Sequence, residues 1–191
     1  MRKSHFTVLF DACVFYPAPL RDFLMRLSLT GSFRAKWTEQ IHEEWKRNLL
    51  DRRADITREQ LDRTSELMNR AVSDSLVTGY EHLIEGLELP DPNDRHVLAA
   101  AIRCSASTIV TFNLKDFPQE TLSHFDIEAL HPDEFTDDLF DLDQSAVLEA
   151  AHGHRASLKN PPFTSGDYLG LLRRQGLGQT VHSLATYIQI L

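Results

Sequence analysis

The sequence has little cysteine and no long hydrophobic run. Its two cysteines, Cys13 and Cys104, lie far apart and match no zinc-binding spacing. This argues against a disulfide framework and favours reduced thiols in a cytoplasmic protein. The apolar stretch 6–10 is too short for the hydrophobic region of a signal peptide, and no stretch approaches membrane-spanning length. We therefore expect no membrane association, and we expect the first residues to belong to the fold.

The chain also lacks the excess of positive charge that is typical of nucleic-acid-binding proteins. Its formal net charge is −8, whereas basic patches usually supply the affinity for phosphate. The acids are unevenly placed, because residues 133–143 (DEFTDDLFDLD) contain six of them and no Lys or Arg, which leaves −2 for the rest of the chain. Candidate phosphate contacts remain in the first part of the chain: Arg21, Arg26, Arg34, Lys36, Lys46, Arg47, Arg52 and Arg53.

Strand and helix patterns alternate over the first two thirds of the chain. Residues 6–10 (FTVLF) and 108–112 (TIVTF) are apolar runs rich in β-forming residues, as in strands buried on both faces of a parallel sheet. Helical patterns lie between them, one beginning after Thr38, a favourable N-cap, and another at Asp91. The sequence therefore predicts an α/β fold with a parallel sheet flanked by helices.

The end of the chain has a different character. The acidic segment 132–144 is typical of a boundary, and residues 145–191 predict three helices that are broken by a Pro-Pro pair and by glycine. We therefore divide the chain into a domain over 1–131, an acidic linker over 132–144, and a small all-α extension over 145–191.

Polar residues follow both predicted strands at the point where each one ends. Asp11 comes directly after the first strand, and Thr111 and Asn113 lie at the end of the second. In open α/β sheets ligands bind beyond the carboxyl ends of the strands, so these side chains should meet at one edge.

Three further acids are placed to join that edge. Asp91 and Asp94 lie three residues apart at the start of a helix that leads into the second strand, and Glu44 belongs to the helix after Thr38. Taken alone, Asp91 is a helix cap and Glu44 an exposed helix acid. Brought together, several carboxylates would repel one another unless a cation neutralised them, and an all-oxygen set suits magnesium or manganese rather than zinc.

Residues 5 to about 131 resemble a PIN domain, a PIN-like (Rossmann-like) nuclease fold. The resemblance rests on four segments and on their order and spacing: VLFDACVF, EEWKRNLL, PDPNDRHVLAAAI and VTFNLKDF. The resemblance implies a metal site made of acidic residues, together with supporting residues that follow the family's fourth strand. By that resemblance the metal and catalytic acids are Asp11, Glu44 and Asp94, with Asp91 as a further acid, and the supporting residues are Thr111, Asn113 and Asp116. Glu43 is the alternative to Glu44.

The resemblance also implies an activity and partners. The family hydrolyses RNA with a divalent metal, here Mg²⁺ with Mn²⁺ as the alternative, and many bacterial members resemble VapC toxins, which a cognate antitoxin holds inactive. The C-terminal helices resemble the extension of one VapC subgroup. We therefore expect an endoribonuclease toxin that acts on RNA, with tRNA as a candidate substrate, and that forms a homodimer. Two positions depart from the pattern: Cys13 stands where Asn or Ser often follows the first acid, and Asn113 replaces a frequent fourth Asp.

Two other functions stay open from the sequence. A haloacid-dehalogenase-like phosphatase would use Asp11, Thr111 and Lys115, but its second Asp, the general acid, would fall where Cys13 stands. A degenerate PIN fold that only binds a partner would not need the acids at the three principal positions. Assays of phosphate-monoester hydrolysis, RNA cleavage and metal binding separate the three.

Overall fold

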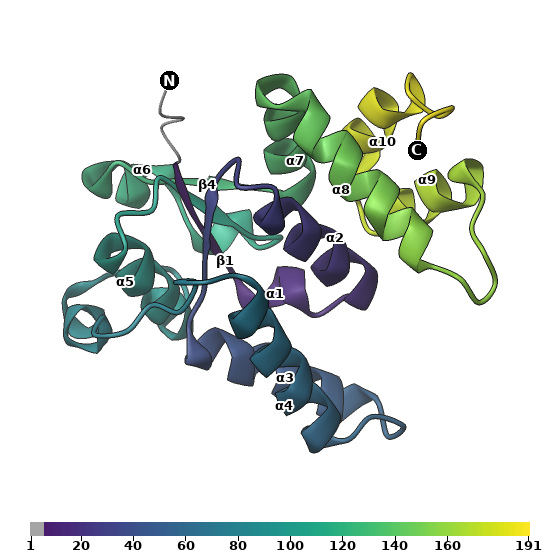
Figure 1. Ribbon diagram of the computed structural model, residues 1–191. Coiled ribbons are helices and arrows are strands. Elements are labelled where there is room, and N and C mark those ends of the chain that lie inside the picture. The colour runs from purple at the N-terminus through teal and green to yellow at the C-terminus, as the bar shows by residue number, and fades with distance from the viewer. Residues whose placement is uncertain (1–5) are drawn as a thin grey trace.

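A computed structural model describes residues 6–191, in which a four-stranded parallel sheet forms the centre (Figure 1). The strand order is β2-β1-β3-β4, and all neighbouring pairs are parallel. The strands are β1 (Thr7–Phe10), β2 (Arg34–Lys36), β3 (Thr108–Val110) and β4 (Glu128–Leu130). The predicted α/β class is confirmed. The expectation that residues 1–5 belong to the fold lies outside the described residues.

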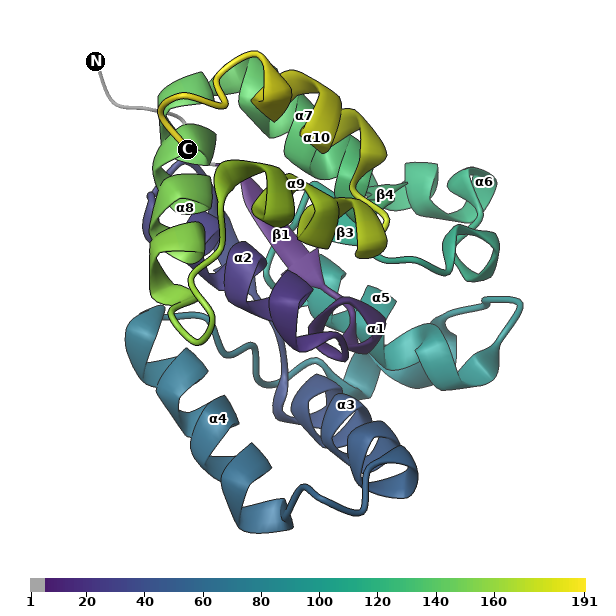
Figure 2. The same cartoon turned by 90° about the vertical axis from the view of Figure 1, so that its right-hand side faces the viewer.

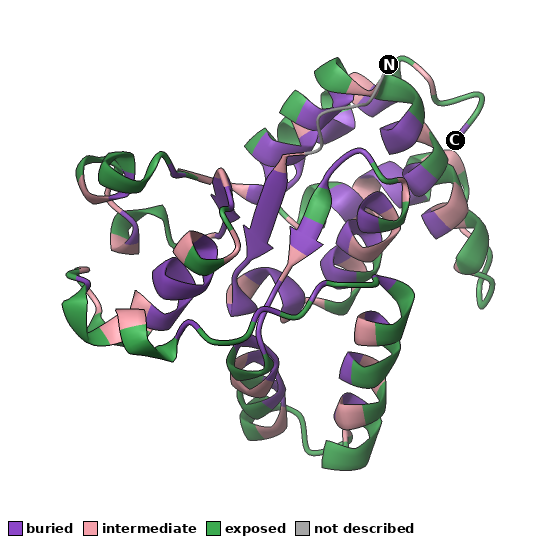
Figure 3. Cartoon of the chain, turned by 60° about the vertical axis from the view of Figure 1, so that its left-hand side comes forward, coloured by how far each residue is buried: buried purple, intermediate pink, exposed green. Residues whose placement is uncertain are grey.

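Helices cover both faces of the sheet, as predicted. The helix α5 (Arg95–Arg103) presents an apolar segment, residues 97–101, that is fully buried and contacts β1 and β3. Figure 1 shows α5 on one side of the sheet, with α2 (Ala18–Leu29) and the C-terminal helices on the other. The short helix α1 (Ala12–Phe15) follows β1 directly. All four residues of β1 are buried, while the outward faces of the peripheral helices are exposed (Figure 3).

The helices α3 (Glu39–Arg52) and α4 (Arg58–Ala71) pack against each other below the sheet (Figure 2). Thr38 caps α3 as predicted, because its hydroxyl accepts a hydrogen bond from the Ile41 N–H at 3.0 Å. Two short elements lie between α4 and α5, η1 (Glu81–Gly86) and η2 (Pro92–Asp94). Three more lie between β3 and β4: η3 (Leu114–Asp116), α6 (Gln119–Leu122) and η4 (Ser123–Phe125).

Two of the cations that we considered as phosphate contacts have structural roles instead. Arg21 is buried, donates to the Phe15 carbonyl at 2.7 Å and lies 4.8 Å from the centre of the Trp45 ring. Lys46 is also buried, and it forms ion pairs with Glu43 and Asp62 at 2.6 and 2.8 Å. Neither side chain is available to RNA, because the packing of helices encloses both.

The acidic segment is a helix rather than the linker that we expected. The helix α7 (Pro132–Leu142) begins two residues after β4, and its apolar side chains face inward while most of its acids are exposed. Phe135 on this helix packs edge-on against Phe10 and Phe33, at ring distances of 5.9 and 5.2 Å. The run of acids concealed this amphipathic pattern in the sequence. Because its apolar side chains pack inward, α7 belongs to the packed structure.

The extension adds three helices to α7, as predicted: α8 (Gln144–Ser157), α9 (Ser165–Arg174) and α10 (Gly178–Ala185). It packs on α2 mainly through α8, where the ring of His154 stacks on Phe23 at 6.1 Å. Figure 2 shows the extension gathered along one side of the sheet domain. Within residues 6–191 no helix is both long and apolar enough to cross a membrane.

Candidate active site

Asp11 lies at the carboxyl end of β1 and is held by three hydrogen bonds. Its side chain caps α1 by accepting from the Ala12 N–H at 2.6 Å, and it also accepts from the Thr111 hydroxyl at 2.7 Å and the Cys13 thiol at 3.1 Å. The residue is only 5% exposed. The sheet register explains the meeting of Asp11 and Thr111, because β1 and β3 are neighbours and Phe10 lies opposite Val110.

Burial raises the pKa of Asp11 although the three hydrogen bonds act to lower it, and the negative charge of Glu44 raises it further. The free energy of the ionised carboxylate is therefore unfavourable in this position unless a positive charge comes near it. A strand-end carboxylate in such a place is typical of a group with a binding or catalytic role.

Thr111 and Cys13 support Asp11. Thr111 is fully buried at the end of β3, which is the third strand in the described chain rather than the fourth, and its hydroxyl accepts from the Asn113 N–H at 3.0 Å. The Cys13 sulfur lies 3.3 Å from the Thr111 hydroxyl and accepts from the Phe112 N–H at 3.3 Å. Burial, and next the charge of Asp11, raise the pKa of the Cys13 thiol. The thiol thus stays protonated and donates to Asp11, as an Asn or Ser at this position would.

Asp91 caps η2 and Asp94 is its last residue, directly before α5. Asp91 is the helix cap that the sequence suggested, since its carboxylate accepts from the Asn93 N–H at 2.8 Å. The pKa of Asp94 is raised to about 6 by burial and then by four neighbouring negative charges, in decreasing order of effect those of Asp11, Asp91, Asp116 and Glu44. Acids from four separate parts of the chain therefore influence one another here.

Glu44 and Glu43 point to different neighbours. Glu44 Oε1 lies 2.8 Å from Nε2 of His96, a fully enclosed ring on α5 whose nitrogens are not aligned for a hydrogen bond. Glu43 forms ion pairs with Lys46 at 2.6 Å and Arg58 at 2.7 Å, on the side of α3 that faces α4. Of the two glutamates, Glu44 is the one near the other acids.

The supporting residues after β3 have unequal positions. Asp116 is half-buried and adds its charge to the surroundings of Asp94. Asn113 is exposed, and its backbone N–H rather than its side chain contacts the Thr111 hydroxyl. His96 was missed from the sequence because it stands at the start of an apolar helical run, where a buried histidine is the ordinary expectation.

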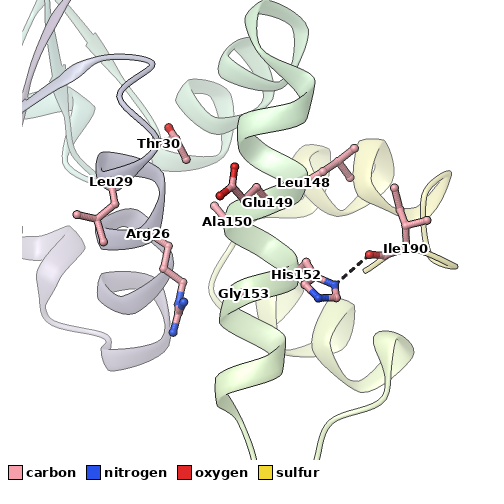
Figure 4. Close-up of a pocket in the computed structure, with 9 residues that line it drawn as sticks. All are labelled: Arg26, Leu29, Thr30, Leu148, Glu149, Ala150, His152, Gly153 and Ile190. Atoms are coloured by element: carbon pink, nitrogen blue, oxygen red, sulfur yellow. Dashed lines mark hydrogen bonds between the residues drawn. The ribbon is translucent and has the colours of Figure 1, made fainter.

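The acids are near one another without surrounding a single point. In the described chain no group of three or more His, Cys, Asp or Glu side chains is arranged so that it could hold a metal ion. Beside Glu44 and Asp94 is a polar hollow of about 430 Å³, here called the α3 hollow, lined by Gln40, Glu44, Arg47, Asn48, Asn93 and Asp94. A larger hollow of about 490 Å³ lies between α2 and α8 and contains none of the site's acids (Figure 4).

Comparisons with known proteins match two separate parts of the chain. The PIN domain family profile matches residues 7–115, and the VapC50 C-terminal domain profile matches residues 132–186. Over 97 residues the chain is 43% identical to a Mycobacterium tuberculosis protein named "Putative ribonuclease VapC50". That match covers 51% of this chain and 57% of the relative, so it spans little more than half of the relative's length. No solved structure matches the chain.

Proposed function

This chain belongs to the PIN-domain family, with a C-terminal extension of the VapC50 type, and on that premise we propose that it is a metal-dependent endoribonuclease and the toxin of a type II toxin-antitoxin pair. The observation that carries the proposal is the mutual influence of Asp11, Glu44 and Asp94 at the carboxyl edge of the sheet. The name of the mycobacterial relative also supports a ribonuclease.

The donor set fits a hard divalent cation. Every candidate ligand is a carboxylate. Burial raises the pKa of Asp94, and the neighbouring acids raise it further by repelling its negative charge, an effect that a cation would reverse. Magnesium usually keeps several water molecules and binds through one or two carboxylates, so it does not require three side chains around one point. We propose that Asp11, Glu44 and Asp94, with Asp91 nearby, hold Mg²⁺ or Mn²⁺.

Bound there, the cation would supply activation of a water nucleophile and neutralisation of phosphate charge. The protein's own part is positioning. Thr111 and Cys13 fix the rotamer of Asp11 by donating to its carboxylate, and His96 lies against Glu44 and restricts its movement. Asn113 and Asp116 lie beyond β3, where they would orient the RNA or water. Hydrolysis by water would leave a 5′-phosphate, and it needs no 2′-hydroxyl, so restriction to RNA would come from shape.

The remaining parts of the proposal concern partners. We propose a cytoplasmic protein that acts on RNA, with tRNA as the candidate substrate, that is inhibited by a cognate antitoxin and that forms a homodimer. Membership of the PIN family counts against the phosphatase alternative. The binding-module alternative is separated by the test below, because a module would not cleave RNA.

Purified protein incubated with total RNA tests the function. We expect cleavage in magnesium, none in chelator, and 5′-phosphate ends that can be ligated to an adaptor. Asp94→Asn should lower the rate by about 100-fold or more, because loss of even an indirect metal contact costs up to that much. The matched control is Asp141→Asn, an exposed acid on α7, which should cleave like the wild type. Cleavage that survives chelator or Asp94→Asn would refute the proposed site.

A further inference from the structure

The α3 hollow has a wall of which the function proposed above uses only Glu44. Gln40, Glu44, Arg47 and Asn48 are spaced by four, three and one residues on α3, so they share one face of the helix. The opposite wall comes from η2, with Asn93 and Asp94. The hollow thus begins at two of the acids and continues along a row of amide groups and one arginine.

The polar groups of this wall are available for a ligand. Arg47 is exposed and takes part in no ion pair or side-chain hydrogen bond with residues 6–191. The side-chain amides of Asn48 and Asn93 likewise have no partner in the described chain. Gln40 accepts only a long hydrogen bond of 3.5 Å from the Tyr80 hydroxyl, which leaves its NH₂ group free to donate.

Lys46, the cation next to Arg47 on α3, has different surroundings. Lys46 lies on the face toward α4 and is neutralised by Glu43 and Asp62. Arg47, one residue later, points away from that network. The positive charge of Arg47 therefore lies beside the acids but forms no ion pair with them. A polyanion that approached the acids would come close to this charge.

We propose that the α3 hollow is a nucleotide subsite of the RNA substrate. Arg47 binds a backbone phosphate next to the scissile one, since guanidinium is the side chain best suited to phosphate oxygens. The amides of Gln40 and Asn48 donate to and accept from the edge of the adjoining base, as Asn and Gln do elsewhere. This inference rests on the proposed function, because it assumes that RNA passes the acids.

The test measures binding separately from cleavage. The probe is a fluorescently labelled single-stranded RNA pool of random sequence, with Ca²⁺ in place of Mg²⁺ and with intact RNA verified on a gel. We expect Arg47→Gln to weaken binding about tenfold, the usual effect of one charged hydrogen-bonding group. The slope of log affinity against log salt should fall by about one.

The matched control is Arg63→Gln, which makes the same change of charge. Arg63 is exposed on α4, which packs on the other side of α3. The Arg63→Gln variant should bind the RNA pool with an affinity within twofold of that of the wild type. Equal effects of the two variants, or no effect of Arg47→Gln, would overturn the subsite.

Cleavage in magnesium gives the second readout. Mapping of the cut ends should show that Asn48→Ala and Gln40→Ala change the base preference at one position beside the cut, while Mn²⁺ binding measured by calorimetry stays unchanged. An unchanged preference in both variants would refute the base contact. If the wild type binds RNA through Arg47 but never cleaves it, the proposed function is refuted and the subsite is supported. If the wild type cleaves RNA and Arg47→Gln changes neither binding nor cleavage, the subsite is refuted and the proposed function is supported.

Discussion

Asp133→Ala should weaken the packing of α10, the last helix, against α7, although Asp133 lies far before that helix in the sequence. Asp133 is 7% exposed at the start of α7, and its carboxylate accepts hydrogen bonds from the N–H groups of Gln179 and Thr180 and from the Thr180 hydroxyl, each at 2.9 Å. These donors form the first turn of α10. One buried carboxylate therefore caps a helix that lies 46 residues away.

The magnitude follows from what each donor would lose. Thr180 is fully buried, so its N–H would have no water to replace the carboxylate, at a cost of about 1–3 kcal/mol. Its hydroxyl keeps a bond to the Asp133 carbonyl at 3.3 Å, and the N–H of the exposed Gln179 can reach water. Adding about 1 kcal/mol for the lost cap gives a destabilisation of about 3 kcal/mol. Asp133→Asn, which keeps one acceptor oxygen, should lose less.

Urea denaturation followed by circular dichroism measures this free energy. The matched control is Asp137→Ala on the same helix, whose carboxylate accepts one hydrogen bond from the Ser183 hydroxyl of α10 at 2.6 Å. Because that bond is partly exposed, its loss should cost only about 1 kcal/mol. The reasoning is refuted if the two alanine variants are equally stable, or if Asp133→Ala loses less than Asp133→Asn.

Two further predictions concern His154 and Cys13. The pKa of His154 is lowered to about 4 by burial and by the charge of Arg26, so below pH 6.5 the unfolded chain binds a proton that the folded chain excludes. The contribution of His154 to stability should therefore fall by up to about 3 kcal/mol as the pH drops from 6.5 toward 4, and the difference in urea midpoint between the wild type and His154→Gln should change over this range; an unchanged difference would contradict the assignment. Cys13→Ser keeps a donor to Asp11 and should cleave RNA within about threefold of the wild type, whereas Cys13→Ala should lose about tenfold; equal rates would show that the thiol does not position Asp11.

Elements with a local signal could be predicted from the sequence, and elements that depend on distant pairing could not. The four buried residues of β1 and the cap at Thr38 can each be recognised from a few neighbouring residues in the sequence. The strands β2 and β4 have three residues each and contain Arg34, Lys36 and Glu128. They are strands because β1 and β3 offer them hydrogen bonds, which is a property of the sheet and not of their own sequence.

The same distinction holds for the site. The approach of Asp11 to Thr111 follows from parallel strands that end at one edge, and this could be predicted from two apolar runs. Which of Glu43 and Glu44 lies beside the other acids could not be predicted, because it depends on how α3 is rotated against α4. Two ion pairs join the helices, one between Glu43 of α3 and Arg58 of α4 and the other between Lys46 of α3 and Asp62 of α4. This pairing between two polar helices cannot be predicted from the sequence of either helix alone.

Burial has opposite effects on the acids of the site and on the histidine of the extension. The pKa of Asp94 is raised to about 6 from 3.8, so in the metal-free protein its contribution to stability is full below pH 3.8 and is lost as the pH rises through 6. His154 contributes in the reverse direction over nearly the same window. The contributions of Asp94 and His154 therefore offset each other in the pH dependence of the whole protein, and neither can be obtained from the wild-type curve alone. Only the subtraction of single variants can separate the energetic cost of gathering acids at the sheet edge from that of docking the extension on α2.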